Sequence, residues 1–176
     1  DNKFSFAAMY GQLNKAVNPD TLGNEPCYKR FGGGFKLGYT GDQLDVGFNI
    51  FKAKDVENSL QFGTGDSIVV KPKDNLAGSL AVKLKLVSNL TFTGEYALSF
   101  MNQDIGIADS ITGSTSNFFE ERGDVSKYSA IKASVSQSSK IGNAGVSYER
   151  VAPNYNTLGA YYFTNNFENI TLNFSA

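Results

Sequence analysis

The sequence predicts an all-β protein, an antiparallel up-and-down transmembrane β-barrel of about eight strands, either complete or part of a larger barrel. Three observations support this fold class. Apolar side chains alternate with period two, tight turns alternate with long polar loops, and the second face of the expected strands carries mostly small side chains. Residues 1–176 are expected to form a single barrel domain or a barrel fragment.

The composition argues against several classes of function. The chain has 16 basic and 17 acidic residues among 176, so its net charge of −1 gives no reason to expect a nucleic-acid partner. It has no histidine and one cysteine, Cys27, which excludes a Ser-His-Asp triad, a Cys-His dyad, a histidine-ligated metal and an internal disulfide. We therefore predict no enzymatic activity and no cofactor, and we expect Cys27 to be a free thiol in a loop.

The first three strands are expected over residues 3–13, 31–40 and 44–50. In each of them large apolar or aromatic side chains occupy one face, and mostly Gly, Ala, Ser, Thr and occasional charged side chains occupy the other. Gly41-Asp42-Gln43 separates the second strand from the third, so these two strands are expected to form a tight hairpin.

Five more strands follow the same pattern. Residues 77–86 and 90–100 are expected to form a second hairpin, residues 130–136 and 143–149 a weaker third, and residues 170–174 a last strand. The tight turns fall near positions 41, 88 and 138, whereas the other connections are long and polar, at about 14–29, 54–74, 102–126 and 151–166. Short turns at one end and long loops at the other are typical of outer-membrane β-barrels.

The side chains on the less apolar face favour a membrane barrel over a soluble one. A face in contact with water would carry many Lys and Glu, but this one is dominated by Gly, Ala, Ser and Thr, which suit a confined lumen. The occasional charges on it are candidates to face the lumen, where they would either brace the wall by cross-strand pairing or tune ion selectivity: Lys36, Asp45, Lys83, Lys85, Glu95, Lys132 and Glu149.

The apolar face is expected to contact lipid. Its candidate lipid-facing residues are Phe35, Leu37, Val46, Phe48, Leu80, Val82, Leu84, Phe92, Tyr96 and Val146. Aromatic residues expected near strand ends would form interfacial girdles: Phe4, Tyr10, Phe31, Tyr39, Tyr96, Phe100 and Tyr148.

Acidic loop residues could in principle offer oxygen ligands to calcium, namely Asp55, Glu57, Asp66, Asp104 and Asp109. Their spacing matches no EF-hand loop, so we expect solvated acidic loops and no metal site. Phe31-Gly32-Gly33-Gly34-Phe35 lies inside a strand pattern and is expected to permit sheet curvature rather than to bind a nucleotide.

One segment carries a resemblance. Residues 146–163, VSYERVAPNYNTLGAYYF, followed by NNFENIT at 165–171, look like part of the large porin-like outer-membrane barrels of the Bacteroidota, and KDNL at 73–76 and GEYALS at 94–99 are similar to the same group. The resemblance implies a bacterial outer-membrane location and contact with outer-membrane lipid, but no settled activity. Bacterial barrels commonly end in an aromatic residue, whereas this chain ends in Phe174-Ser175-Ala176, so we expect a fragment of a longer barrel.

Two functions are consistent with these features. The first is the wall of a porin-like or transport channel, in which small polar residues line a watery lumen. The alternative is a membrane-anchored interaction or secretion-system-associated barrel that binds a protein partner through its long extracellular loops, including the aromatic segment 158–167.

Overall fold

The computed structural model describes residues 3–19, 25–61, 70–87, 89–106, 125–160 and 164–176. Eight strands make up the fold: β1 (Lys3–Asn14), β2 (Arg30–Thr40), β3 (Leu44–Asp55), β4 (Asp74–Val87), β5 (Leu90–Asn102), β6 (Val125–Ser139), β7 (Gly142–Val151) and β8 (Phe167–Ser175). A short 3-10 helix, η1 (Glu57–Ser59), follows β3. Within the described ranges, no helix is long and apolar enough to cross a membrane.

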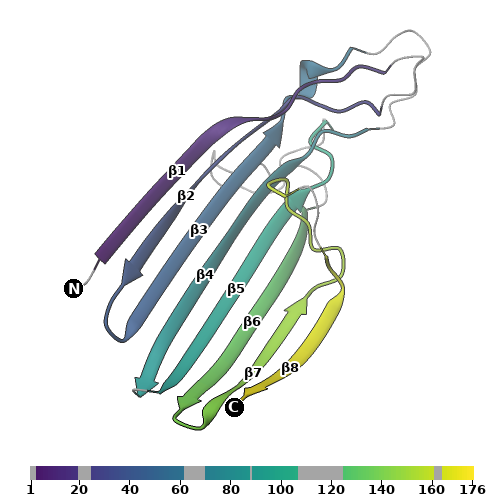
Figure 1. Cartoon of the computed structure of the whole chain (residues 1–176). Helices are drawn as coiled ribbons and strands as arrows, with labels where there is room; N and C mark the ends of the chain where they lie inside the picture. Colours follow the sequence, from purple (N-terminus) through teal and green to yellow (C-terminus); the bar gives the residue numbers. More distant parts are fainter. Residues whose placement is uncertain (1–2, 20–24, 62–69, 88, 107–124, 161–163) are drawn as a thin grey trace.

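The strands form one antiparallel meander in the order β1 to β8, each paired with its neighbours in sequence (Figure 1). The tight turns lie at one end of the sheet with both ends of the chain, and the long connections lie at the other end. The predicted number of strands, their antiparallel order and the alternation of turns and loops are therefore confirmed.

Several strands are longer than the sequence pattern indicates. Residues 54–74 and 102–126 were expected as loops, yet β4 begins at Asp74 and β6 at Val125. At these ends the ladder pairs polar side chains, such as Lys54 with Asp74. Backbone hydrogen bonding continues where the apolar alternation has stopped, and so the pattern of apolar residues underestimates the strand length.

The sheet is open in the part of the chain that the structure describes. β1 pairs only with β2, and β8 pairs only with β7. The ladders are nevertheless staggered, since Lys3 at the start of β1 shares a cross-strand row with Thr171 in the middle of β8. Such a stagger accompanies the strand tilt of barrels. Closure within a larger barrel remains a prediction.

The register separates two chemically different faces. One cross-strand row aligns Leu80, Tyr96 and Ile131, and the adjacent row, on the opposite face, aligns Ala81 with Glu95. We call these the apolar face and the small-residue face. Large side chains on the apolar face are exposed on every strand, among them Phe4, Phe6, Tyr10, Phe35, Leu37, Leu44, Phe48, Leu80, Tyr96, Ile131, Val135, Val146, Ile170, Leu172 and Phe174. No second layer covers this face among the described residues.

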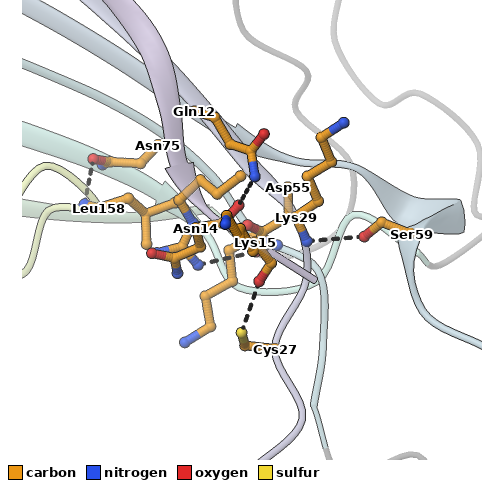
Figure 2. Close-up of polar contacts among 11 residues, drawn as sticks. Gln12, Asn14, Lys15, Cys27, Lys29, Asp55, Ser59, Asn75 and Leu158 are labelled. Carbon is orange, nitrogen blue, oxygen red and sulfur yellow. Dashed lines mark hydrogen bonds and ion pairs between the residues drawn. The ribbon is translucent and has the colours of Figure 1, made fainter. Parts of the chain in front are cut away.

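Buried residues concentrate near the loop end of the sheet, where the long connections are tied together. Arg30 at the start of β2 binds the buried carboxylate of Asp55 through two hydrogen bonds, of 2.7 and 3.1 Å. The Lys73 amide also donates to Asp55, and the Lys29 amide donates to the Ser59 hydroxyl at 2.9 Å (Figure 2). Asp55 thus joins β2, β3 and the approach to β4.

Cys27 lies in the β1–β2 connection. It is a free thiol, as predicted, and its Sγ donates to the carbonyl oxygen of Lys15 at 3.2 Å (Figure 2). An isolated antiparallel bridge between Val17 and Cys27 continues the β1–β2 hairpin beyond the sheet.

The glycines of β2 make room for Phe51 on the small-residue face. A Cβ atom added at Gly32 would lie 3.0 Å from the Phe51 ring, and one added at Gly34 would lie 3.2 Å from it and collide with the carbonyl oxygen of Ile50. These glycines are therefore required by close approach, and the Phe51 ring lies over the β2 backbone because no side chain stands in its way.

This packing makes a testable prediction for Gly34→Ala. We expect it to lower the free energy of unfolding by about 1–3 kcal/mol through overpacking. Gly47→Ala is the matched control, because its Cβ would meet the Ala81 Cβ at an ordinary 3.8 Å. Both changes reduce the entropy of the unfolded chain alike, so their difference isolates the collision. Urea unfolding in lipid vesicles, followed by circular dichroism, measures it; equal midpoints for the two variants would contradict the packing.

Candidate functional site

The candidate site lies on the small-residue face near the loop end, where residues 152–160 of the β7–β8 connection fold back over the strands. We call these residues the inward segment. Its first turn is held by hydrogen bonds from the Ala152 amide to the Ser129 carbonyl at 3.0 Å and from the Tyr155 amide to the Ala152 carbonyl at 3.2 Å. Asn154 has a φ of 60°, a left-handed conformation that asparagine tolerates better than most residues. The segment therefore turns back at Asn154.

Asn75 of β4 anchors the inward segment. Its side-chain oxygen accepts a hydrogen bond from the Thr157 hydroxyl at 2.9 Å. It accepts a second from the Leu158 amide at 3.0 Å (Figure 2). Its side-chain nitrogen donates to the Ser99 hydroxyl and to the carbonyl oxygen of Phe100, both at 2.8 Å. This amide therefore uses both its donors and both its acceptor lone pairs while it is fully buried.

A second anchor comes from β5. The Ser99 hydroxyl donates to the Asn156 carbonyl at 2.6 Å, and Ser99 is fully buried. Further along, a Cβ added at Gly159 would lie 2.8 Å from the Phe51 ring of β3. The inward segment thus leaves β7, contacts β5 and β4, and reaches β3, so it crosses the small-residue face.

A cavity of about 430 Å³ lies between the inward segment and the strands. Its lining combines apolar side chains with a few polar groups: Met9, Leu13, Asn49, Phe51, Ser79, Glu95, Ala97, Tyr155, Thr157 and Gly159. Glu95 is the one charged side chain among its described lining residues. A mainly apolar cavity with few polar groups is typical of a site that accommodates a small solute.

Tyr155 lies in the inward segment at 5% exposure. Burial, and secondarily the negative charge of Glu95, raises the pKa of its hydroxyl above the ordinary value. The phenol therefore stays neutral at physiological pH, and the site contains the Glu95 carboxylate without a second anion from Tyr155.

The predicted lumen-facing residues all fall on the small-residue face, but they do not form one cluster. Asp45 is opposite Lys83, and Glu95, Lys132 and Glu149 follow one another along a single row.

Three of these charged residues have contacts, of two different kinds. Lys132 Nζ lies 3.7 Å from Glu149 Oε2, an exposed pair of little energetic value. Lys85 donates to the Asp42 carbonyl beside a tight turn. Of the seven predicted residues only Glu95 lines the cavity under the inward segment. That the face encloses a lumen remains a prediction.

The ten predicted lipid-facing residues share the apolar face. Phe35 and Phe48 pack there with ring centroids 6.0 Å apart. The expected position of Tyr96 near a strand end is wrong, because it lies at the centre of β5. Tyr96 belongs to the apolar face as predicted, but β5 runs from Leu90 to Asn102, so Tyr96 is six residues from either end. Lipid contact itself remains a prediction.

Two of the acidic residues have other partners, and Asp55 is not the solvated loop residue that was expected, because it ends β3 and is buried. Asp55 binds Arg30, and Asp104 lies 2.9 Å from Lys71 Nζ. Asp66 and Asp109 lie outside the described residues. In the described part of the chain, no three potential ligands are grouped so as to hold a metal ion.

Sequence reasoning missed the anchoring residues Asn75, Ser99 and Thr157. They have no local pattern, since Asn75 and Thr157 are 82 residues apart in the chain. One signal was available in the sequence. Asn75 is an amide residue that shares its strand face with the small residues Ala77 and Ser79. A polar side chain on such a face needs a partner when it is buried.

The anchor predicts the effect of Asn75→Ala. This change leaves the Thr157 hydroxyl and the Leu158 amide without their acceptor, so we expect a loss of about 1–3 kcal/mol in unfolding free energy and faster hydrogen exchange at the Leu158 amide. Asn49→Ala is the control, because the side-chain amide of Asn49 donates to the Ser79 hydroxyl at 3.0 Å and makes no hydrogen bond to the described inward segment. Equal exchange at Leu158 in both variants would exclude the anchor.

Comparison with known proteins adds no further assignment. The chain matches no protein-family model, no curated protein and no solved structure. The proposals for this chain therefore rest on its own sequence and geometry, namely on the two faces of the sheet and on the inward segment.

Proposed function

We propose that this chain forms the wall of a porin-like transport barrel in a bacterial outer membrane. The observation that carries the proposal is the uncovered apolar face, which extends over the strands from Phe4 in β1 to Phe174 in β8. Phe4 is 85% exposed and Leu172 is 79% exposed in the isolated chain. Soluble monomers rarely expose an apolar area of this extent, whereas the outer surface of a membrane barrel consists of it.

The unpaired edges fit the same proposal. Lipid supplies no hydrogen-bond partners, so an exposed strand edge is not tolerated in the bilayer core and the sheet must close. In the proposed barrel β1 and β8 each pair with a further strand on their open side, either with each other or with strands of a larger wall. The staggered register supports closure because tilted strands are what barrels require.

The small-residue face has side chains suited to line a channel for solutes. Small and hydroxyl-bearing side chains leave space, and charges of both signs are spread over it, such as Lys36, Asp45 and Lys83. Eight strands alone would enclose an interior just wide enough to be filled by side chains, whereas more strands leave a watery channel. A transport role therefore agrees best with a wall that belongs to a larger barrel.

Single-channel recording in planar bilayers tests the proposal with the full-length chain. Steady openings whose conductance or ion preference changes in Lys83→Glu or Lys85→Glu would support passage through the barrel. A silent barrel that copurifies with a specific protein partner would instead favour the membrane-anchored interaction protein.

The placement of the apolar face in lipid has its own test. Leu80→Arg, at the centre of β4, is expected to destabilise the folded barrel in vesicles by about 2–4 kcal/mol because it places a charge near the bilayer midplane. Ala81→Arg is the control, because Ala81 is the next residue of β4 and belongs to the small-residue face. We expect this second variant to cost less, since its side chain reaches the lumen. Equal losses in urea titrations would argue against lipid contact at Leu80.

A further inference from the structure

We infer that a groove over β1, β2 and β3 on the apolar face binds a lipid that carries a phosphate headgroup. One acyl chain of this lipid lies in the groove, and its phosphate contacts the lysines at the loop end. This inference rests on the proposed placement of the apolar face in the membrane, and it adds a site that prefers one class of lipid.

The groove, which we call the apolar groove, has a volume of about 550 Å³. This is within the usual range for ligand pockets. Aromatic rings border it, and two lysines of β3 lie at its loop end: Phe6, Tyr10, Phe31, Phe35, Lys52 and Lys54. An apolar hollow with cationic side chains at one end matches the form of a lipid, whose apolar chain ends in a charged headgroup.

Gly33 keeps the apolar groove open. It is opposite Tyr10 in the ladder, and a Cβ atom added at Gly33 would lie 2.9 Å from the Tyr10 ring. The ring can therefore lie close to β2 only because residue 33 has no side chain. It stacks on Phe31, with ring centroids 6.1 Å apart and 6° between the planes. Protein contacts thus hold the aromatic border in place before any ligand binds.

The charges of the apolar face are confined to its loop end. The described strands carry there four basic and two acidic side chains, namely Lys52, Lys54, Lys127, Arg150, Asp74 and Glu168. Lys29 adds another ammonium, 4.9 Å from the centroid of the Phe31 ring that borders the groove. Positive charge in excess at one membrane surface attracts anionic headgroups, and lysine binds phosphate as a point charge. The occupant that complements this groove is therefore an anionic lipid.

Tryptophan fluorescence tests the site, because the chain contains no tryptophan and each variant then has one. Phe35→Trp reports on the groove. Tyr96→Trp is the matched control on the apolar face of β5, since the two original side chains are 38% and 48% exposed. The folded full-length chain is placed in phosphatidylcholine vesicles with a minor fraction of phosphatidic acid whose acyl chains are brominated and quench tryptophan on contact. We expect several-fold stronger quenching in Phe35→Trp than in Tyr96→Trp, and equal quenching when brominated phosphatidylcholine is used instead.

The two lipids separate the failure of the site from the failure of the membrane placement. Equal quenching of both variants by brominated phosphatidic acid overturns the lipid site and leaves the placement of the apolar face in lipid intact. If brominated phosphatidylcholine quenches neither variant, the membrane placement fails, and the lipid site fails with it.

A second arm tests the phosphate contact in the Phe35→Trp background. Lys54→Gln is used because a change of Lys52 would leave the buried carboxylate of Asp74 without its ion pair. We expect the preference for phosphatidic acid to fall about fivefold, which corresponds to about 1 kcal/mol for one lysine near the membrane surface. Lys36→Gln makes the same change on the small-residue face and is expected to keep the preference. An unchanged preference in Lys54→Gln, or an equal loss in both variants, overturns the phosphate contact.

A third arm fills the groove without changing its charges, in the same background. Ala8 lines the groove and is exposed, so Ala8→Leu is expected to abolish the preference for phosphatidic acid. Ala144→Leu makes the same change on the apolar face of β7, away from the groove, and is expected to keep it. A preference that survives Ala8→Leu shows that the groove does not hold the acyl chain and overturns the inference.

Discussion

The structure depends on a register that stays in phase across all seven ladders. Side chains alternate between the faces with a period of two, so a slip of one residue in any ladder would move a whole strand's apolar side chains to the opposite face. The two register shifts lie near strand ends, between Gln12 and Asn14 and between Lys85 and Val87. The central rows, such as the one through Phe48, Leu80 and Tyr96, therefore remain uninterrupted.

Small side chains on one face create the space that the inward segment uses. Gly32 and Gly34 admit the ring of Phe51, and Gly159 of the inward segment also approaches that ring closely. Asn75 pairs with Ala53 and Ser99 pairs with Ala77, and the segment approaches these strands closely enough for direct hydrogen bonds. The small-residue face is thus partly covered by a connection between strands.

The strand order of the sheet could be predicted from the sequence, whereas the contacts of the candidate site could not, and the reason is physical. Alternation in β2 or β5 is a local property of the chain, and each tight turn joins neighbouring strands, so the strand order follows from short-range patterns. The bond between Asn75 and Thr157 joins positions with no shared periodicity and no characteristic spacing. The apolar alternation did not predict the extra length of β4 and β6, because backbone pairing does not require apolar side chains.

The meander also determines the order in which this sheet can assemble. Every ladder joins strands adjacent in the chain, so the sheet can grow by one hairpin at a time, and each step closes only a modest loop. The bonds of Asn75 to the inward segment need β4 and the connection after β7 to be present together. They therefore form late, after β5, β6 and β7 have joined the sheet, and a chain whose inward segment is in place has already assembled most of its sheet.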